Sequence, residues 1–177
     1  SLALQPMPRL HERAARGVLA HEPRGELHRA NSAAPPRLLV TANVLVGLRD
    51  GGLETQGAFA MIPEEEKVFA VDVALPAGWD VAAVTEEGGT PLAFERYGPA
   101  GQAGRLHVLL PAGIPPGQEK RLYFTARHVP PEWFDAWQSQ QFVFPVFTVA
   151  GATRDVGAAA VAAYDDMAVR PLTLEGL

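Results

Sequence analysis

The chain has 177 residues, of which 47% are hydrophobic and 20% charged, and its formal net charge is −5. This composition is too apolar for a disordered tail, and the length suits one domain with or without an extension. The negative charge argues against binding to nucleic-acid phosphates, and the absence of cysteine excludes disulfides, thiolate catalysis and cysteine-type zinc sites.

Residues 1–37 differ in composition from the rest of the chain. They hold six arginines and three glutamates, so this stretch is basic whereas the remainder is acidic. It ends at Pro35-Pro36, where neither residue has a backbone N–H to give to a β-sheet. We predict a basic N-terminal arm or edge-strand extension over residues 1–37 and a second region, a β-sandwich domain, over residues 38–177.

After Pro36 the hydrophobic period changes to two residues. Apolar side chains occupy every second position from Val40 to Leu48, which is typical of a strand with one buried face. Further short apolar stretches follow, each bounded by Gly or Pro, and this spacing predicts an all-β, antiparallel β-sandwich. The further predicted strands are 53–62, 68–75, 81–84, 92–97, 106–110, 122–126, 143–150, 158–164 and 167–174.

One short helix is predicted near residues 131–138. Pro131 suits a first helical turn, and Trp133 and Trp137 are four residues apart, so they would share a helix face. Elsewhere, a Leu-Pro-Ala-Gly phrase occurs at 75–78 and again at 110–113, and we interpret both copies as turns that end a strand.

Motifs for catalysis or metal binding are incomplete. His11-Glu12 begins like a zinc-binding helix, but Ala15 stands where the second histidine is needed. His107 and His128 are expected on separate strands, and the Gly-rich stretch 98–104 lacks the Lys-Ser/Thr ending of a phosphate-binding loop. No serine lies in a nucleophile elbow. We therefore predict no catalytic residue, no metal ligand and no cofactor.

Aromatic side chains near predicted strand ends and loops are the candidate functional residues. Such rings either pack the core or, where exposed, stack on a sugar ring or anchor a protein partner. The candidate ligand or partner surface consists of Trp79, Tyr97, Trp133 and Trp137.

The stretch from Phe69 to Ala126 resembles the non-catalytic N-terminal β-sandwich domain of gluzincin aminopeptidases. The resemblance lies in a strand ending in a Leu-Pro phrase, a Val-rich strand, a Pro-Gly turn and a further strand, and it implies a scaffold without a catalytic role. The tail from Phe144-Pro145 through Gly157 to Leu177 resembles β-rich ectodomains of large uncharacterised bacterial proteins. The residues that carry the first resemblance are 69–84, 89–94, 106–119 and 122–124.

These observations favour a non-catalytic accessory domain of a larger bacterial protein, which presents a surface to a neighbouring domain or another protein. The alternative is a carbohydrate-binding module whose aromatic platform takes a glycan. A third hypothesis is a hydrolase on a β-sandwich scaffold. No apolar run is long enough to span a bilayer, so we expect no membrane insertion by this segment. We expect an extracytoplasmic location, periplasmic or at the cell surface, with any signal or anchor outside the segment.

Overall fold

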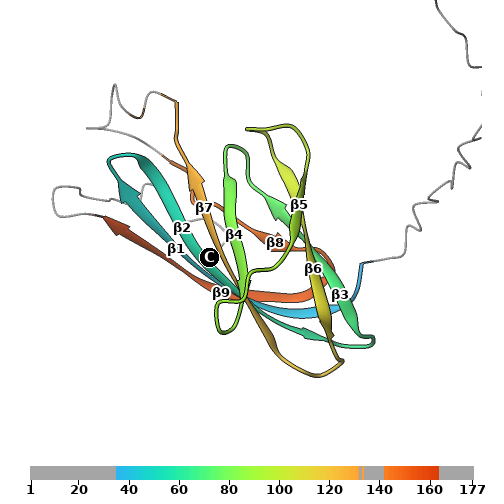
Figure 1. The fold of residues 1–177 in the computed structure, drawn as a ribbon. Coiled ribbons are helices and arrows are strands. Elements are labelled where there is room, and N and C mark those ends of the chain that lie inside the picture. The colour runs from blue at the N-terminus through green and yellow to red at the C-terminus, as the bar shows by residue number, and fades with distance from the viewer. Residues whose placement is uncertain (1–34, 132, 134–141, 164–177) are drawn as a thin grey trace, which may run out of the picture. The chain divides into compact units, whose positions relative to one another are not determined.

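A computed structural model of the chain describes residues 35–131, 133 and 142–163, and these form nine strands in two sheets (Figure 1). The chain divides between Ala33 and Ala34 into two units, and the first of them lies outside the described residues. The arm over residues 1–37 and its boundary therefore stay predictions.

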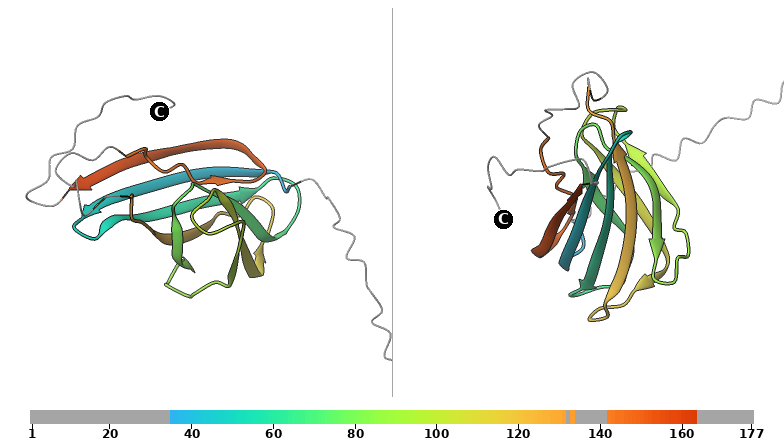
Figure 2. Two further views of the ribbon diagram at one scale, coloured as in Figure 1. Left: turned by 90° about the horizontal axis from the view of Figure 1, so that it is seen from above. Right: turned by 90° about the vertical axis from the view of Figure 1, so that its left-hand side faces the viewer.

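The two sheets lie face to face, as Figure 2 shows from two directions. Sheet A contains, in spatial order, β4 (Asp80–Glu86), β7 (Lys120–His128), β2 (Gly52–Pro63), β1 (Leu38–Arg49) and β9 (Ala152–Ala163). Sheet B contains β5 (Phe94–Tyr97), β6 (Gly104–Ile114), β3 (Val68–Leu75) and β8 (Thr148–Val149). The predicted all-β sandwich is confirmed.

The alternation of apolar and polar residues along the sequence explains most of this architecture. β1 and β2 form an antiparallel hairpin in which Arg49 faces Gly52 across the turn at Asp50-Gly51. Gly52 has a φ of 123°, in the region that favours glycine. Along β2, alternate residues from Leu53 onward are buried against sheet B, as expected for a strand with one face in the core.

The position of β9 corrects the expectation of a purely antiparallel fold. β9 pairs with β1 in parallel, from Leu38 opposite Ala152 to Leu48 opposite Ala163. The reason is the crossing from sheet B: after β8 the chain turns at Gly151, whose carbonyl oxygen accepts a hydrogen bond from the Leu38 N–H. β9 therefore starts at the end of the sheet where β1 starts, and it must run in the same direction.

Two other local predictions differ from the structure, and two more fall mostly or wholly outside the described residues. Residues 142–147 have no regular structure, so the strand predicted over 143–150 is confirmed only at β8, since Pro145 cannot donate to a ladder. The second Leu-Pro-Ala-Gly phrase does not end a strand but forms a bulge within β6 opposite Phe69. Most of the predicted helix 131–138 and the predicted strand 167–174 lie outside the described residues; Pro131 and Trp133 themselves lie in a turn.

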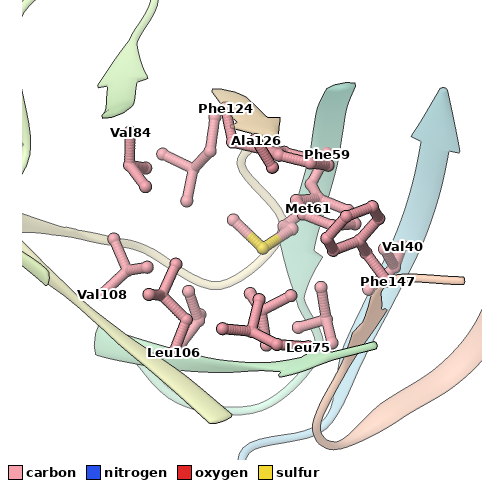
Figure 3. Close-up of a cluster of buried hydrophobic side chains, with 14 of the residues drawn as sticks. Val40, Phe59, Met61, Leu75, Val84, Leu106, Val108, Phe124, Ala126 and Phe147 are labelled. Carbon is pink, nitrogen blue, oxygen red and sulfur yellow. The ribbon is translucent and has the colours of Figure 1, made fainter. Parts of the chain in front are cut away.

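The core fills the space between the sheets with apolar side chains from both (Figure 3). The Phe124 ring stacks on Phe59 with centroids 5.1 Å apart and lies 4.8 Å from the Phe147 ring. A small gap remains beside these rings. Its volume of about 10 Å³, measured for the centre of a water molecule, is just enough to hold one water. All ten side chains that line this gap are apolar, so it is a packing gap rather than a binding site.

Candidate functional site

The outer face of sheet B gathers polar and aromatic side chains from three adjacent strands. Asp72 on β3 faces His107 on β6, which in turn faces Glu95 on β5. In the next row Arg105 on β6 faces Tyr97 on β5. Side chains directly opposite each other on one sheet face lie about 5 Å apart, so each of these five residues can contact its neighbour on the adjacent strand. We call these five residues the Tyr97 cluster.

Contacts within the Tyr97 cluster connect all of its members. Asp72 binds two neighbours: its Oδ1 lies 2.8 Å from Nδ1 of His107, and its Oδ2 accepts a hydrogen bond of 3.3 Å from Arg105. The Arg105 guanidinium lies 5.0 Å from the centre of the Tyr97 ring, a cation–π arrangement. The Tyr97 hydroxyl donates to Glu95 at 2.6 Å.

The cluster orders side chains more than it stabilises the fold. The Arg105 side chain is 55% exposed and Asp72 is 29% exposed, and ion pairs this open to water contribute little to the free energy of unfolding. The hydrogen bond to Glu95, followed by the negative charge of that carboxylate, raises the pKa of the Tyr97 phenol above its ordinary value. The phenol therefore stays protonated and a hydrogen-bond donor over a wider pH range.

Exposed apolar side chains continue the same face toward the β6 bulge. Leu109 lies two residues beyond His107 on β6 and is 43% exposed, and Phe69 on β3 is 56% exposed. The Lys67 ammonium lies 5.0 Å from the centre of the Phe69 ring. We call the Tyr97 cluster together with Phe69 and Leu109 the sheet B face.

The four candidate aromatic residues do not come together on one surface. Trp79 is 3% exposed and packs its ring 6.0 Å from Phe147. Trp133 is 4% exposed, and its indole N–H lies within hydrogen-bond distance of the carbonyl oxygens of Arg49 and Asp50. These two rings therefore pack the core in this structure. Trp137 lies outside the described residues.

Among the candidates in the described part of the chain, Tyr97 is the exposed one, at 44%, and its contacts with neighbouring strands escaped the sequence analysis. Asp72, Glu95 and His107 are ordinary outward positions of three predicted strands, and Arg105 directly precedes the strand predicted over 106–110; 33 or more residues separate Asp72 from its β6 partners. The sequence offers one weak indication of these partners, which is that polar residues alternate with the buried Leu106 and Val108. Nothing in the sequence fixes the register that brings them together.

The two histidines considered as a pair have separate partners. His107 contacts Asp72 on sheet B, whereas Nδ1 of His128 on sheet A donates to the carbonyl oxygen of Gly78 at 2.8 Å. Within residues 35–131, 133 and 142–163, no three His, Asp or Glu side chains form a group that could hold a metal ion. The same part of the chain contains no helix of the length and hydropathy needed to cross a bilayer.

Solved structures with a related fold include peptidases and a cohesin. The M1 zinc metallopeptidase of Deinococcus radiodurans matches with a TM-score of 0.42 and 20% identity, over 53% of this chain and 21% of that one. A non-cellulosomal cohesin from Archaeoglobus fulgidus matches with a TM-score of 0.41 and 9% identity, over 73% of this chain and 94% of the cohesin. Aminopeptidase A of Legionella pneumophila matches with a TM-score of 0.40 and 11% identity, over 54% of this chain and 11% of the aminopeptidase.

The predicted resemblance to the N-terminal β-sandwich domain of gluzincin aminopeptidases, zinc peptidases of this kind, is confirmed as a likeness of fold alone. This chain spans about a fifth of the length of the Deinococcus peptidase, and nothing of that enzyme's activity is carried over from the match. No protein-family profile matches the sequence, and no curated protein does.

Proposed function

We propose that this chain is a non-catalytic interaction domain of a larger bacterial protein, and that it binds a protein partner or a neighbouring domain through the sheet B face. The observation that carries the proposal is the exposed Tyr97–Arg105 pair, fixed in place by Glu95 and Asp72. An extracytoplasmic location stays a prediction.

The residue types of the sheet B face match those that dominate protein interfaces. Tyr and Arg are enriched among the side chains whose truncation costs most binding free energy. The exposed apolar Leu109 lies four residues from Arg105 along β6, and Phe69 is exposed on β3 near the β6 bulge. A partner that covers the whole sheet B face would therefore bury aromatic, aliphatic and guanidinium surface together.

The contacts within the cluster also lower the entropic cost of binding. A free arginine or tyrosine side chain loses rotamer freedom when a partner immobilises it. In this structure Tyr97 is already held by its hydrogen bond to Glu95, and Arg105 lies against both Asp72 and the Tyr97 ring. Part of the ordering has therefore taken place before a partner arrives.

The glycan-binding alternative receives less support from the positions of the rings. A stacking platform needs exposed aromatic faces, and Trp79 and Trp133 are buried. The Tyr97 ring lies under the Arg105 guanidinium on one side and edge-on to His107. These contacts cover part of the ring surface on which a sugar would stack.

Site-specific photocrosslinking tests the proposal. A benzophenone amino acid placed at Leu109 of the full chain, followed by irradiation in extract of the source cells, should give a discrete adduct identified by mass spectrometry. The matched control is the same label at Tyr123, which is similarly exposed but lies on the outer face of sheet A. Equal labelling from both positions, or none from Leu109, would contradict the proposal.

The identified partner then allows a quantitative test. Replacing Tyr97→Ala or Arg105→Ala should weaken binding of the purified partner at least tenfold, because each removes a pre-ordered anchor. Tyr123→Ala should leave the dissociation constant unchanged. Unchanged affinity in both cluster variants would remove the Tyr97 cluster from the interface.

A further inference from the structure

His107 occupies the middle of the sheet B face. On β6 it lies two residues from Arg105 and two from Leu109, and side chains two apart on a strand point to the same face. Asp72 on β3 and Glu95 on β5 lie opposite His107 on the two neighbouring strands. A partner that covers the sheet B face therefore covers the imidazole as well.

Asp72 fixes the proton of the neutral imidazole on Nδ1. Nδ1 of His107 lies 2.8 Å from Oδ1 of Asp72, and Arg105 donates to Oδ2 of the same carboxylate at 3.3 Å. An ionised carboxylate only accepts hydrogen bonds, so the imidazole nitrogen beside it must be the donor. In a neutral ring the other nitrogen then carries a lone pair and no proton. Nε2 of His107 is thus a hydrogen-bond acceptor.

This acceptor is open to a partner. The His107 side chain is 32% exposed, and within residues 35–131, 133 and 142–163 its Nε2 has no hydrogen-bond partner. The Tyr97 ring lies edge-on to the imidazole, with centroids 6.4 Å apart, and its hydroxyl donates to Glu95 instead. Covering an acceptor without giving it a hydrogen bond costs binding free energy. A partner on this face therefore needs a donor opposite Nε2.

The charges around His107 favour such a donor. Asp72 and Glu95 each carry one negative charge and Arg105 carries one positive charge. Tyr97 is uncharged, because the neighbouring Glu95 raises the pKa of its phenol. With a neutral imidazole, two negative charges and one positive charge give the Tyr97 cluster a net charge of −1. An N–H or ammonium group of a partner is attracted to this surplus of negative charge.

We propose that the partner of the sheet B face donates a hydrogen bond, from an N–H or ammonium group, to Nε2 of His107, and that protonation of His107 weakens the complex. This inference rests on the proposed function and adds its regulation by pH. An imidazole changes its charge between pH 5 and 8. Protonation turns Nε2 from an acceptor into a donor, so that two donors face each other, and it removes the surplus of negative charge.

The change is confined to the outward side of the ring. Imidazolium and Arg105 use different oxygens of Asp72, so both contacts of this carboxylate persist when His107 is protonated. The cluster therefore keeps its geometry in acid and alkaline solution, and the difference between the two states is what Nε2 offers to a partner.

Nitrogen-15 NMR of the imidazole rings in the full chain tests the first step without a partner. The signal that disappears in His107→Gln identifies His107 among the five histidines. At pH 8 we expect a proton on Nδ1 and none on Nε2. Asp72→Ala removes the acceptor and should give a mixture of the two tautomers. The matched control Glu54→Ala removes a carboxylate from sheet A and should leave the tautomer unchanged. A proton on Nε2 of the wild type would refute the proposal.

The second step is measured with the partner identified by crosslinking at Leu109. Its affinity for the wild type should fall by about tenfold for each pH unit below the titration of His107 in the free chain, because the complex excludes the proton. His107→Gln retains an acceptor that does not titrate, so it should bind at pH 8 and lose the pH dependence. His107→Phe retains a ring without an acceptor and should bind about tenfold more weakly at pH 8. Thermal unfolding at both ends of the pH range verifies that each variant remains folded.

The proposed function and this inference fail in different ways. The absence of a specific adduct at Leu109 would remove the proposed function and the pH regulation with it. With a partner in hand, an affinity independent of pH, or an equal pH dependence in the wild type and His107→Gln, would overturn the role of His107 and leave the sheet B face as the interface. Tighter binding at pH 5 would mean that the partner presents an acceptor such as a carboxylate, and would also refute the inference.

Discussion

The space between the two sheets and the outer face of sheet B use different chemistry, although adjacent residues of the same strands line both. Between the sheets, the contacts are apolar, and Thr55 is the buried polar residue of the described part. On the outer face, Asp72 and Arg105 alternate along the chain with the buried Val73 and Leu106 and form an exposed polar network.

This difference separates stability from recognition. Apolar burial contributes roughly 25 cal/mol per Å² to folding, whereas exposed ion pairs contribute at most about 1 kcal/mol. Substitutions between the sheets should therefore change the free energy of unfolding, and substitutions in the Tyr97 cluster should change binding while the fold persists. The following predictions test that separation, beginning with the largest expected effect.

Phe124→Ala should cause the largest loss of stability. The Phe124 ring stacks on Phe59 and contacts Phe147 between the sheets, so its removal should lower the free energy of unfolding by about 3–5 kcal/mol. Urea denaturation measures the loss. Its neighbour Tyr123 points to the other side of β7, and Tyr123→Ala should cost about 1 kcal/mol or less. Similar losses in both variants would show that the two sides are not energetically distinct.

Gly57→Ala should destabilise the interior by overpacking. A Cβ at Gly57 would lie 2.2 Å from the Phe124 ring, so we expect a loss of about 1–3 kcal/mol. Because the conflict is with this ring, the double variant Gly57→Ala/Phe124→Leu should lose less than the sum of the two single variants. Strict additivity in urea denaturation would mean that the ring does not contact residue 57.

Thr55→Val should stabilise the protein. The Thr55 side chain is 1% exposed, and its hydroxyl has no hydrogen-bond partner in the structure. Replacing this hydroxyl with a methyl group removes an unsatisfied buried polar atom, worth about 1 kcal/mol. The exposed Thr41 on the outer face of β1 provides the control, since Thr41→Val should change stability by no more than about 0.5 kcal/mol. A loss of stability in Thr55→Val would reveal a partner for the hydroxyl, such as a bound water.

Tyr97 should show the smallest effect, a raised phenol pKa. The Glu95 carboxylate raises the pKa of Tyr97 above 10.0 in the folded state. The stabilisation that the Tyr97–Glu95 hydrogen bond gives to the fold is therefore fully present below pH 10. It is lost as the pH rises through the folded-state pKa of Tyr97. Absorbance titration of the wild type minus that of Tyr97→Phe isolates this phenol. In the Glu95→Gln variant its pKa should fall toward the ordinary value; an unchanged titration would show that Glu95 does not hold the hydroxyl in solution.

The sequence alone determined where most of the strands lie and, away from the β6 bulge, which side chains of each strand share a face. The reason is local: in an extended chain, successive side chains point to opposite faces, so the alternation from Val40 to Leu48 or around Leu106 can be recognised without knowing any partner. The same logic located Tyr97 near the end of a strand, although it left open whether each aromatic ring is exposed.

Only the tertiary structure decided which strands are neighbours and in which direction they pair. β9 became parallel to β1 because the chain crosses from sheet B at Gly151, and Asp72 met His107 because β3 and β6 pair in one particular register. These choices depend on contacts between segments far apart in the sequence, whose free energy is shared over the whole core. Both the Tyr97 cluster and the place of β9 at the end of sheet A follow from them, so no local pattern could have specified either.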